Sequence, residues 1–415
     1  MWETDTIGRF AFFILHFAFF IFHFDFGSLV RGLRIGLCGR LVEYVAMTKL
    51  SEIFGQDIAV GALRKALRSN ELPGSYLIVG ADGTGKFALA KAFAQAATCV
   101  SPHEDPFDSC GVCDSCRRAE SGSQPDILTI RPAGEQIQIW QFWDRPGRQT
   151  PGALTRTLAY APVIGRRRVY IVESADRLTE SAANSLLKAL EEPPPYGLFI
   201  LLAPHPARVL PTILSRCQIV RLTPIAVLEL AAYLSENHSV DLERAKMLAA
   251  YCEGRIGNAI TLAAVPAVGD EIERILDFAE SLPAAAAHRA LRAAETLRKI
   301  AGQTKALLGE EPAESIDADG EQSTIKEKTG RKQFAMVFDM LVTYYRDLLA
   351  LRVGTGSEAV VNRHRLESLT ASAAAGCPER WTRCLNALLA ARRRLDANAN
   401  VALVTETLMM ALLAP

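Results

Sequence analysis

Short apolar runs alternate with segments of helical spacing through the middle of the chain. A first helix is predicted over residues 53–69, because Ile58, Leu63 and Leu67 recur at helical spacing with Lys and Arg on the other side. The runs of strand length begin at Tyr76 and at residues 127–130, 169–172, 198–202 and 219–222. Helical segments separate them, as parallel βαβ units require. The pattern predicts an α/β domain with a parallel sheet and helices on both faces.

A glycine-rich turn follows the first strand. Residues 76–91 read YLIVGADGTGKFALAK and match the pattern G-x-x-x-x-G-K-[ST] except at its last position, where Phe87 stands. Glycines let backbone N–H groups point at an anion, and Lys86 can reach outer phosphates, but Phe87 cannot hold Mg²⁺. The strand before the turn and the helix after it favour a nucleotide loop over a chance glycine-rich turn. The candidate nucleotide-binding residues are Gly80, Gly83, Thr84, Gly85 and Lys86.

A carboxylate follows the third strand, but a general base does not. Residues 168–172 lead into Glu173, Ser174 and, two residues on, Asp176. A working ATPase of this kind offers an Asp that helps hold Mg²⁺ and then an acidic residue that polarises the attacking water. Glu173 is the candidate for the first position, and Ser174 has no useful basicity at the second. Glu173 and Asp176 are equally compatible with surface carboxylates at a strand-to-helix turn.

Four of the nine cysteines lie close together, with the last three spaced C-x2-C-x2-C. Four thiolates are what a closed tetrahedral structural zinc needs, and such a site has no open position for catalysis. An iron–sulfur cluster and four metal-free thiols are the alternatives, although no fourth cysteine and proline follow at ferredoxin spacing. The other cysteines are scattered, which indicates a reducing, cytoplasmic compartment. The candidate metal ligands are Cys99, Cys110, Cys113 and Cys116.

Composition sets bounds on the function. The chain has 415 residues, of which 49% are hydrophobic, enough for two or three domains with their own cores. Its 46 Lys and Arg balance 46 Asp and Glu, which argues against coating nucleic acid by charge alone. Residues 1–46 include a phenylalanine-rich run at 10–26 with His16, His23 and Asp25. We interpret 1–46 as an extension outside the fold, and a membrane anchor is the alternative.

The chain is predicted to be helical after Pro224. Residues 227–235 and 241–252 predict a small lid within 224–268, with Gly254 and Gly257 at a turn between its helices. A helical domain follows over 269–415. Its acidic segment 309–330 is predicted to be a loop. A basic run at Arg392 and the next two arginines is read as a solvated helix face rather than a DNA contact.

Three features together resemble one known family. The run NSLLKALEEPPP at 184–195, the segment ILSRCQ at 213–218 and the four-cysteine insertion are similar to the clamp-loader subunits of bacterial DNA polymerase III, to the delta-prime type more than to gamma/tau. The resemblance covers about 50–222. It implies an AAA+ domain at 47–223, a lid, and a helical collar that joins delta and gamma/tau subunits in a hetero-pentameric ring, which loads the sliding clamp onto primed DNA. It also implies that Arg216 acts in trans, as an arginine finger at a neighbour's nucleotide.

The departures from the gamma/tau pattern involve four parts of the hydrolytic site. These are Phe87, the Glu173-Ser174 pair, Pro204 near an expected polar residue, and Gly257 where the lid arginine would stand. The resemblance therefore implies a largely non-hydrolysing component of the polymerase holoenzyme, able to bind ATP and Mg²⁺ only weakly. An active gamma-type ATPase and a zinc-bearing AAA+ scaffold outside replication are the alternatives. For Arg216, the alternative is a simple pair with a carboxylate at a subunit contact.

Overall fold

The structure, a computed structural model, describes residues 49–69, 72–104, 107–132, 136–143, 154–265, 268–283, 285–307, 325–356, 360–397 and 399–414. The predicted extension 1–46 lies outside the described residues, as does most of the predicted loop 309–330. None of the described helices is long and apolar enough to cross a membrane.

A five-stranded sheet forms the centre of the N-terminal half, as predicted. Its strands are β4 (Ile127–Ile130), β5 (Arg168–Val172), β6 (Gly197–Ala203), β1 (Ser75–Val79) and β7 (Gln218–Arg221), in that spatial order. All neighbouring strands are parallel, and Ile130 lies opposite Val172 while Val79 lies opposite Ala203. The carboxyl ends of the strands therefore meet at one edge, where the loop after β1 lies.

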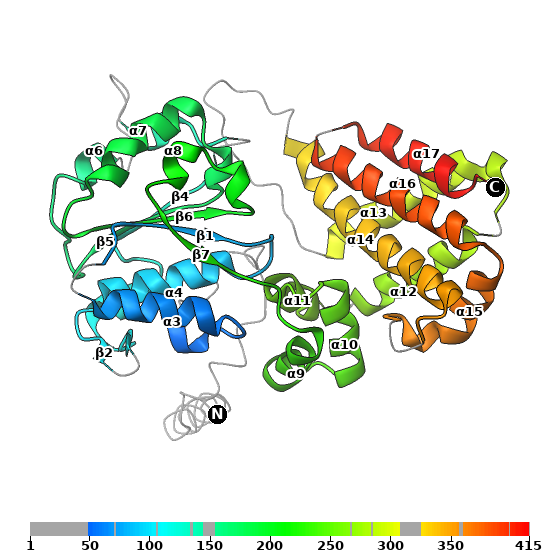
Figure 1. Ribbon diagram of the computed structural model, residues 1–415, viewed down its shortest axis with the longest axis horizontal. Coiled ribbons are helices and arrows are strands. Elements are labelled where there is room, and N and C mark those ends of the chain that lie inside the picture. Colours follow the sequence, from blue (N-terminus) through cyan, green and yellow to red (C-terminus); the bar gives the residue numbers. More distant parts are fainter. Residues whose placement is uncertain are drawn as a thin grey trace, which may run out of the picture. The chain divides into compact units, whose positions relative to one another are not determined.

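Helices cover both faces of this sheet because its strands are apolar on both sides. Alternate strand residues divide into two cores, with Ile78 and Ile171 in one and Leu77 and Tyr170 in the other. The helices α3 (Asp57–Arg68) and α4 (Lys86–Thr98) cover the first face, whereas α6 (Leu154–Thr157), α7 (Glu180–Glu191) and α8 (Pro211–Leu214) cover the second (Figure 1). The predicted fold class is confirmed.

The first predicted helix is shorter than expected, and its buried face is different. It begins at Asp57, and Ile58 is 92% exposed rather than buried. Ala59, Val60, Leu63 and Leu67 form the face on the core instead. The reason is the residue before the helix: the buried Gln56 side chain donates to the carbonyl of Thr223 at 2.7 Å and accepts from the N–H of Thr223 at 3.3 Å. These bonds fix where α3 starts and hence its rotation.

Shorter elements fill the connections. The cysteine-rich segment contains β2 (His103–Glu104), β3 (Phe107–Asp108) and α5 (Asp114–Glu120), with β2 and β3 antiparallel. Turns of 3₁₀ helix lie at Leu50–Glu52, Ile139–Gln141, Ala175–Arg177, Pro206–Arg208, Ala287–Arg289 and Arg363–Arg365.

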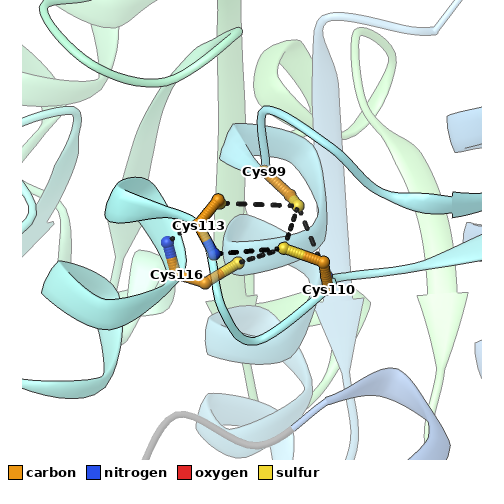
Figure 2. A group of neighbouring side chains, drawn as sticks. All are labelled: Cys99, Cys110, Cys113 and Cys116. Carbon is orange, nitrogen blue, oxygen red and sulfur yellow. Dashed lines mark hydrogen bonds between the residues drawn. The ribbon is translucent and has the colours of Figure 1, made fainter.

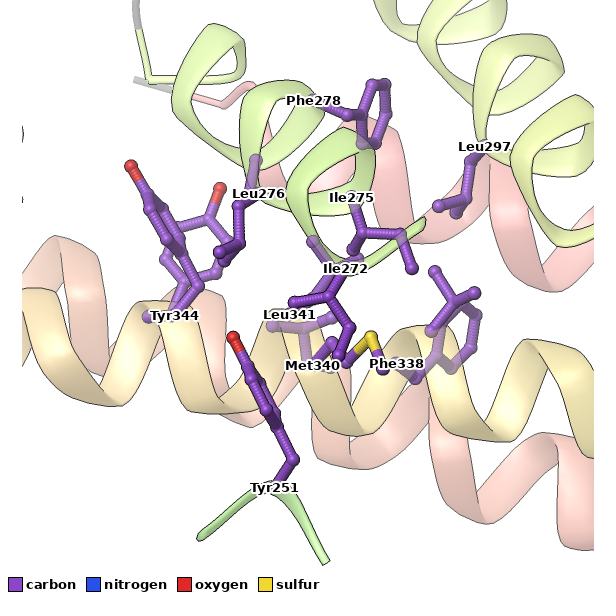
Figure 3. Close-up of a cluster of buried hydrophobic side chains, with 14 of the residues drawn as sticks. Tyr251, Ile272, Ile275, Leu276, Phe278, Leu297, Phe338, Met340, Leu341 and Tyr344 are labelled. Atoms are coloured by element: carbon purple, nitrogen blue, oxygen red, sulfur yellow. The ribbon is translucent and has the colours of Figure 1, made fainter. Parts of the chain in front are cut away.

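The rest of the described chain is helical. The lid consists of α9 (Val227–His238), α10 (Leu242–Tyr251) and α11 (Ile256–Ala263). The collar helices are α12 (Val268–Ser281), α13 (Ala290–Leu307), α14 (Ile325–Val353), α15 (Leu366–Ala374), α16 (Pro378–Asp396) and α17 (Val401–Leu412). One continuous apolar core runs through both sets, from Ile225 to Leu413. Figure 3 shows the part of this core around Ile272, Phe338 and Leu341.

Two details of the helical prediction were wrong. Gly254 is in the predicted turn, with φ of 75°, but Gly257 lies inside α11 rather than between helices. The acidic loop was predicted to extend to residue 330, yet α14 begins at Ile325, because residues 325–330 form the first turns of a long helix that continues to Val353. The basic run lies on α16, where Arg392 pairs with Asp339 of α14 at 3.4 Å.

Candidate functional site

The glycine-rich loop joins β1 to the N-terminus of α4. Gly83 and Gly85 have φ of 83° and 92°, the left-handed conformation that glycine adopts without strain, and Gly85 caps α4. Lys86 Nζ donates to the carbonyls of Gly80 at 2.6 Å and Ala81 at 3.0 Å, and lies 3.1 Å from Asp82 Oδ1. The lysine thus turns back into the loop, and a phosphate would have to replace these partners.

The lid contacts the same loop directly. The N–H of Gly257, in the first turn of α11, donates to the carbonyl of Gly83 at 2.7 Å. A Cβ on Gly83 would lie 2.3 Å from the Asn258 side chain, and one on Gly257 would lie 3.0 Å from the Gly83 carbonyl oxygen. Glycine at both positions lets the two backbones approach this closely. The residue that stands where the lid arginine was expected therefore serves a backbone contact.

The residues at the predicted magnesium position do not fit a divalent cation. Phe87 has no oxygen, and its ring lies 4.6 Å from Lys91 Nζ and 5.6 Å from the guanidinium of Arg131. Arg131 in turn donates to Glu173 Oε1 at 2.8 Å. Arg131 directly follows β4 and Glu173 directly follows β5, so their parallel pairing brings the two together. Cations that contact an aromatic face and neutralise the nearby carboxylate oppose binding of Mg²⁺.

Arg131 was not predicted from the sequence, although its place after a strand could have indicated it. Charged residues at the carboxyl ends of parallel strands gather at one edge of the sheet.

Ser174, beside Glu173, has φ of 57°, which is unusual for a residue with a Cβ, and leads into the turn Ala175–Arg177. Asp176 Oδ1 is buried without a hydrogen-bond partner among the described residues. Pro204, predicted to lie near the position of a polar residue in gamma/tau subunits, directly follows β6.

The four clustered cysteines converge on one point (Figure 2). Their sulfur atoms all lie within 4.8 Å of one another, and Cys99 and Cys116 are buried. Sulfur–sulfur distances are 3.6 Å for Cys99–Cys110 and 3.9 Å for both Cys99–Cys113 and Cys110–Cys116. Zinc–sulfur bonds of about 2.3 Å in a tetrahedron place sulfurs roughly 3.8 Å apart. The donor set therefore fits a closed four-thiolate metal site.

Local backbone geometry prepares these sulfurs for a cation. The N–H groups of Cys110, Cys113 and Cys116 donate to the preceding cysteine sulfurs at 3.4, 3.3 and 3.5 Å. Hydrogen bonding with Cys116 lowers the pKa of Cys99 to about 5, and the same contact and burial raise the pKa of Cys116. Donors aimed at sulfur favour the thiolate form that metals bind.

The cysteine segment is attached to the α/β domain by a buried carboxylate. Asp108, at the end of β3, accepts from the N–H of Leu50 at 3.1 Å and of Ser51 at 2.8 Å, and lies 3.4 Å from Arg64 of α3. Ser115 of α5 donates to the carbonyl of Thr98 at 3.0 Å. The segment is thus attached to the α/β domain at two places.

Arg216 lies just after α8, outside the glycine-rich loop. Its Nε donates to Glu191 Oε1 at 2.7 Å, and its Nη2 also pairs with that oxygen. Its Nη1 donates to the carbonyl of Thr212 at 2.8 Å and to Ser215 Oγ at 3.2 Å. Glu191 is the last residue of α7 and belongs to the quoted NSLLKALEEPPP run, but the sequence alone did not indicate its contact with Arg216.

Comparison with known proteins agrees with the family resemblance. Residues 55–226 match the family described as "DNA polymerase III, delta subunit". DNA polymerase III subunit delta' of Bacillus subtilis is 29% identical over 350 residues, covering 84% of this chain and 94% of that protein. DNA polymerase III subunit tau of Escherichia coli is 31% identical over 217 residues, covering 51% of this chain but only 32% of that protein.

A solved structure, a DNA polymerase III gamma subunit-related protein from Thermotoga maritima, aligns over 80% of this chain and 99% of its own, at 20% identity and a TM-score of 0.37. The sequence matches confirm the resemblance. The chain is a relative of the delta-prime and tau subunits of bacterial DNA polymerase III, and its residues 55–226 match the delta-subunit family.

Proposed function

We propose that this chain is a delta-prime-type subunit of the DNA polymerase III clamp loader, which contributes little or no ATP hydrolysis of its own. The proposal is supported most by one contrast: the nucleotide site has Phe87, Ser174 and the Arg131–Glu173 pair where hydrolysis needs a hydroxyl, a base and a metal. Arg216, by comparison, is present after α8, and its guanidinium donates to the carbonyl of Thr212 in that helix. The residues that would hold a nucleotide weakly are Gly80, Gly83, Thr84, Gly85 and Lys86 at the glycine-rich loop, with Glu173 after β5.

Partners follow from the same proposal. The chain would join delta and gamma/tau subunits in a hetero-pentameric ring, and would meet the sliding clamp and primed DNA through that complex. Within the ring, Arg216 would enter the nucleotide site of the adjacent ATPase subunit. A guanidinium supplied in this way stabilises negative charge that develops on the transferred phosphoryl group.

We also infer that Cys99, Cys110, Cys113 and Cys116 hold a structural zinc ion. Support comes from the donor set of four sulfurs and from the N–H groups directed at three of them. Bound zinc would supply a cross-link between the end of α4 and α5 and no catalysis, because four protein ligands leave no open position.

The test of the proposed function is a reconstituted loader that contains delta, gamma/tau and this chain. Arg216→Ala should leave assembly intact but lower DNA-stimulated ATP hydrolysis, since the site it serves is expected to lose on the order of 10³-fold in rate. Arg208→Ala, at an exposed position in the nearby turn, is the matched control. The isolated chain should not turn over ATP. An unchanged rate with Arg216→Ala, failure to assemble, or ATP turnover that Lys86→Ala abolishes would contradict the proposal.

A further inference from the structure

Within the chain itself, the carboxylate of Glu191 pairs with the guanidinium of Arg216. Two of the three guanidinium nitrogens, Nε and Nη2, contact Glu191 Oε1, and the third, Nη1, donates to Thr212 and Ser215. Every nitrogen of the side chain is therefore engaged by α7, α8 or the turn after α8. The side chain of Arg216 is nevertheless 33% exposed and that of Glu191 46% exposed, so the pair lies at the surface.

We propose that Glu191 is a positioning residue that holds Arg216 docked on its own chain, in competition with the phosphates of a neighbouring nucleotide. This inference rests on the proposed function of Arg216. A guanidinium bound through Nε and Nη2 cannot offer that edge to a second anion until the carboxylate releases it. The docked state is one of two alternatives for the same side chain, and the approach of a phosphoryl group decides between them.

The strength of the docked state is suited to such an exchange. An exposed ion pair shifts an equilibrium by a modest factor, roughly up to fivefold, whereas a polyphosphate carries more charge than one carboxylate. Glu191 would thus hold Arg216 back when the neighbouring site is empty or misaligned, and would release it when phosphates are in place. Removal of the negative charge should favour the released side chain without altering the packing of α7, because Glu191 is the last residue of that helix.

The chain offers a matched control in the next residue. Glu192 is also an exposed glutamate at the end of α7, but the described contacts of the Arg216 guanidinium are with Glu191 and not with Glu192. The substitutions Glu191→Gln and Glu192→Gln therefore remove the same charge at neighbouring positions, and only the first removes the partner of Arg216.

The experiment compares the two variants in the reconstituted loader, with the parent chain and Arg216→Ala as references. ATP hydrolysis is measured without DNA and with primed DNA, over a range of salt concentrations. We expect Glu191→Gln to raise the rate without DNA about two- to fivefold over Glu192→Gln, with a smaller difference when DNA is present. The ratio of the two rates should fall towards one as salt increases, because salt weakens the exposed pair in the control.

Two results would overturn the inference. Equal rates for the two glutamine variants at every salt concentration would mean that Glu191 does not restrain Arg216. A loss of activity in Glu191→Gln like that of Arg216→Ala would mean that the carboxylate presents the arginine rather than holding it back. Thermal unfolding of each variant checks that folding is intact. Failure of the proposed function is distinguishable, because then Arg216→Ala itself leaves the rate unchanged.

Discussion

At the residue scale, Phe87 replaces the hydroxyl residue of the loop pattern, and its neighbours add to the effect of that replacement. The ring stands where a hydroxyl would hold Mg²⁺, and the Arg131 guanidinium lies over the ring while it neutralises Glu173. The loss of the hydroxyl and the gain of a positive charge therefore act together. A hydroxyl at position 87 alone would leave the positive charge of Arg131 in place, and removal of Arg131 alone would leave the site without the hydroxyl.

The nucleotide site offers a direct test of this coupling. Phe87→Thr alone should bind a fluorescent ADP analogue no better with Mg²⁺ than with EDTA, because Arg131 still pairs with Glu173. Phe87→Thr combined with Arg131→Ala should gain affinity in Mg²⁺ on the order of tenfold. Arg131→Ala alone is the control, since it lacks the hydroxyl. Magnesium-dependent binding by Phe87→Thr alone would contradict the argument.

Asp126 is a second residue whose surroundings decide its chemistry. It is fully buried and accepts from the N–H groups of Val163, Ile164 and Gly165 at 2.7, 2.8 and 2.8 Å, with Arg168 at 3.1 Å. Burial alone would raise the pKa of Asp126, but these hydrogen bonds outweigh burial and hold the pKa below its ordinary value of 3.8. The ionised form is thus part of the folded state.

We expect Asp126→Asn to lower the free energy of unfolding by about 3 kcal/mol, because Arg168 stays buried without a counter-charge. The control is Asp114→Asn, whose partner Arg118 is at the same distance, 3.1 Å, but on the surface; it should change stability by less than about 1 kcal/mol. Urea unfolding measures both. The contribution of the depressed pKa is present above about pH 4 and is lost as pH falls through the folded-state pKa, so Asp126→Asn should remove that part of the acid sensitivity.

At the scale of elements, the cysteine segment is a short hairpin and a two-turn helix that contain little apolar core of their own. Among its buried side chains, Phe107 packs on the main core, and Asp108 and Ser115 are held by hydrogen bonds. Small units of this kind need a cross-link or a metal to remain ordered.

Metal content tests the cysteine site. The purified chain should contain about one zinc per molecule, and Cys116→Ser should lose it and unfold at a lower temperature. Cys377→Ser, at an exposed cysteine outside the cluster, is the control. Elemental analysis and thermal unfolding provide the measurements. A zinc-free native protein, a zinc-loaded Cys116→Ser, or bound iron with visible absorption would contradict the zinc assignment.

At the scale of the whole molecule, the lid and the collar share one hydrophobic core, whereas the sheet has two of its own. A polar link reinforces the shared core. Tyr251, the last residue of α10, donates its hydroxyl to Asn362 Oδ1, and Asn362 Nδ2 donates to the buried Asp347 at 2.7 Å. Buried polar groups that are fully paired fix one arrangement of the elements that carry them.

This link predicts unequal effects for two similar substitutions. Tyr251→Phe should lower the free energy of unfolding by about 1–3 kcal/mol, since Asn362 is left buried without its donor. Tyr345→Phe should be neutral or slightly stabilising, because the buried Tyr345 hydroxyl has no hydrogen-bond partner among the described residues. Chemical denaturation of the full chain compares them. Equal losses for the two variants would refute the role of the link.

The sequence by itself determined the features that are local or periodic. Strands that are buried on both faces must be short apolar runs. The residues of the glycine-rich loop are consecutive in the sequence, and a four-thiolate site takes most of its ligands from one turn and the helix that follows it. The strands and the loop were predicted to within a few residues. The rotation of α3 was not predicted, because Gln56 fixes it through a bond to a residue 167 positions away.

Only the tertiary structure decided which distant residues meet. The order of the strands brings Arg131 to Glu173, 42 positions apart, and the packing of α7 against α8 brings Glu191 to Arg216, 25 positions apart. The contact of Gly257 with Gly83 likewise depends on the position of α11 at the loop. Such contacts have no sequence period, because they arise from the order in which strands and helices pack and not from the repeat of any one of them.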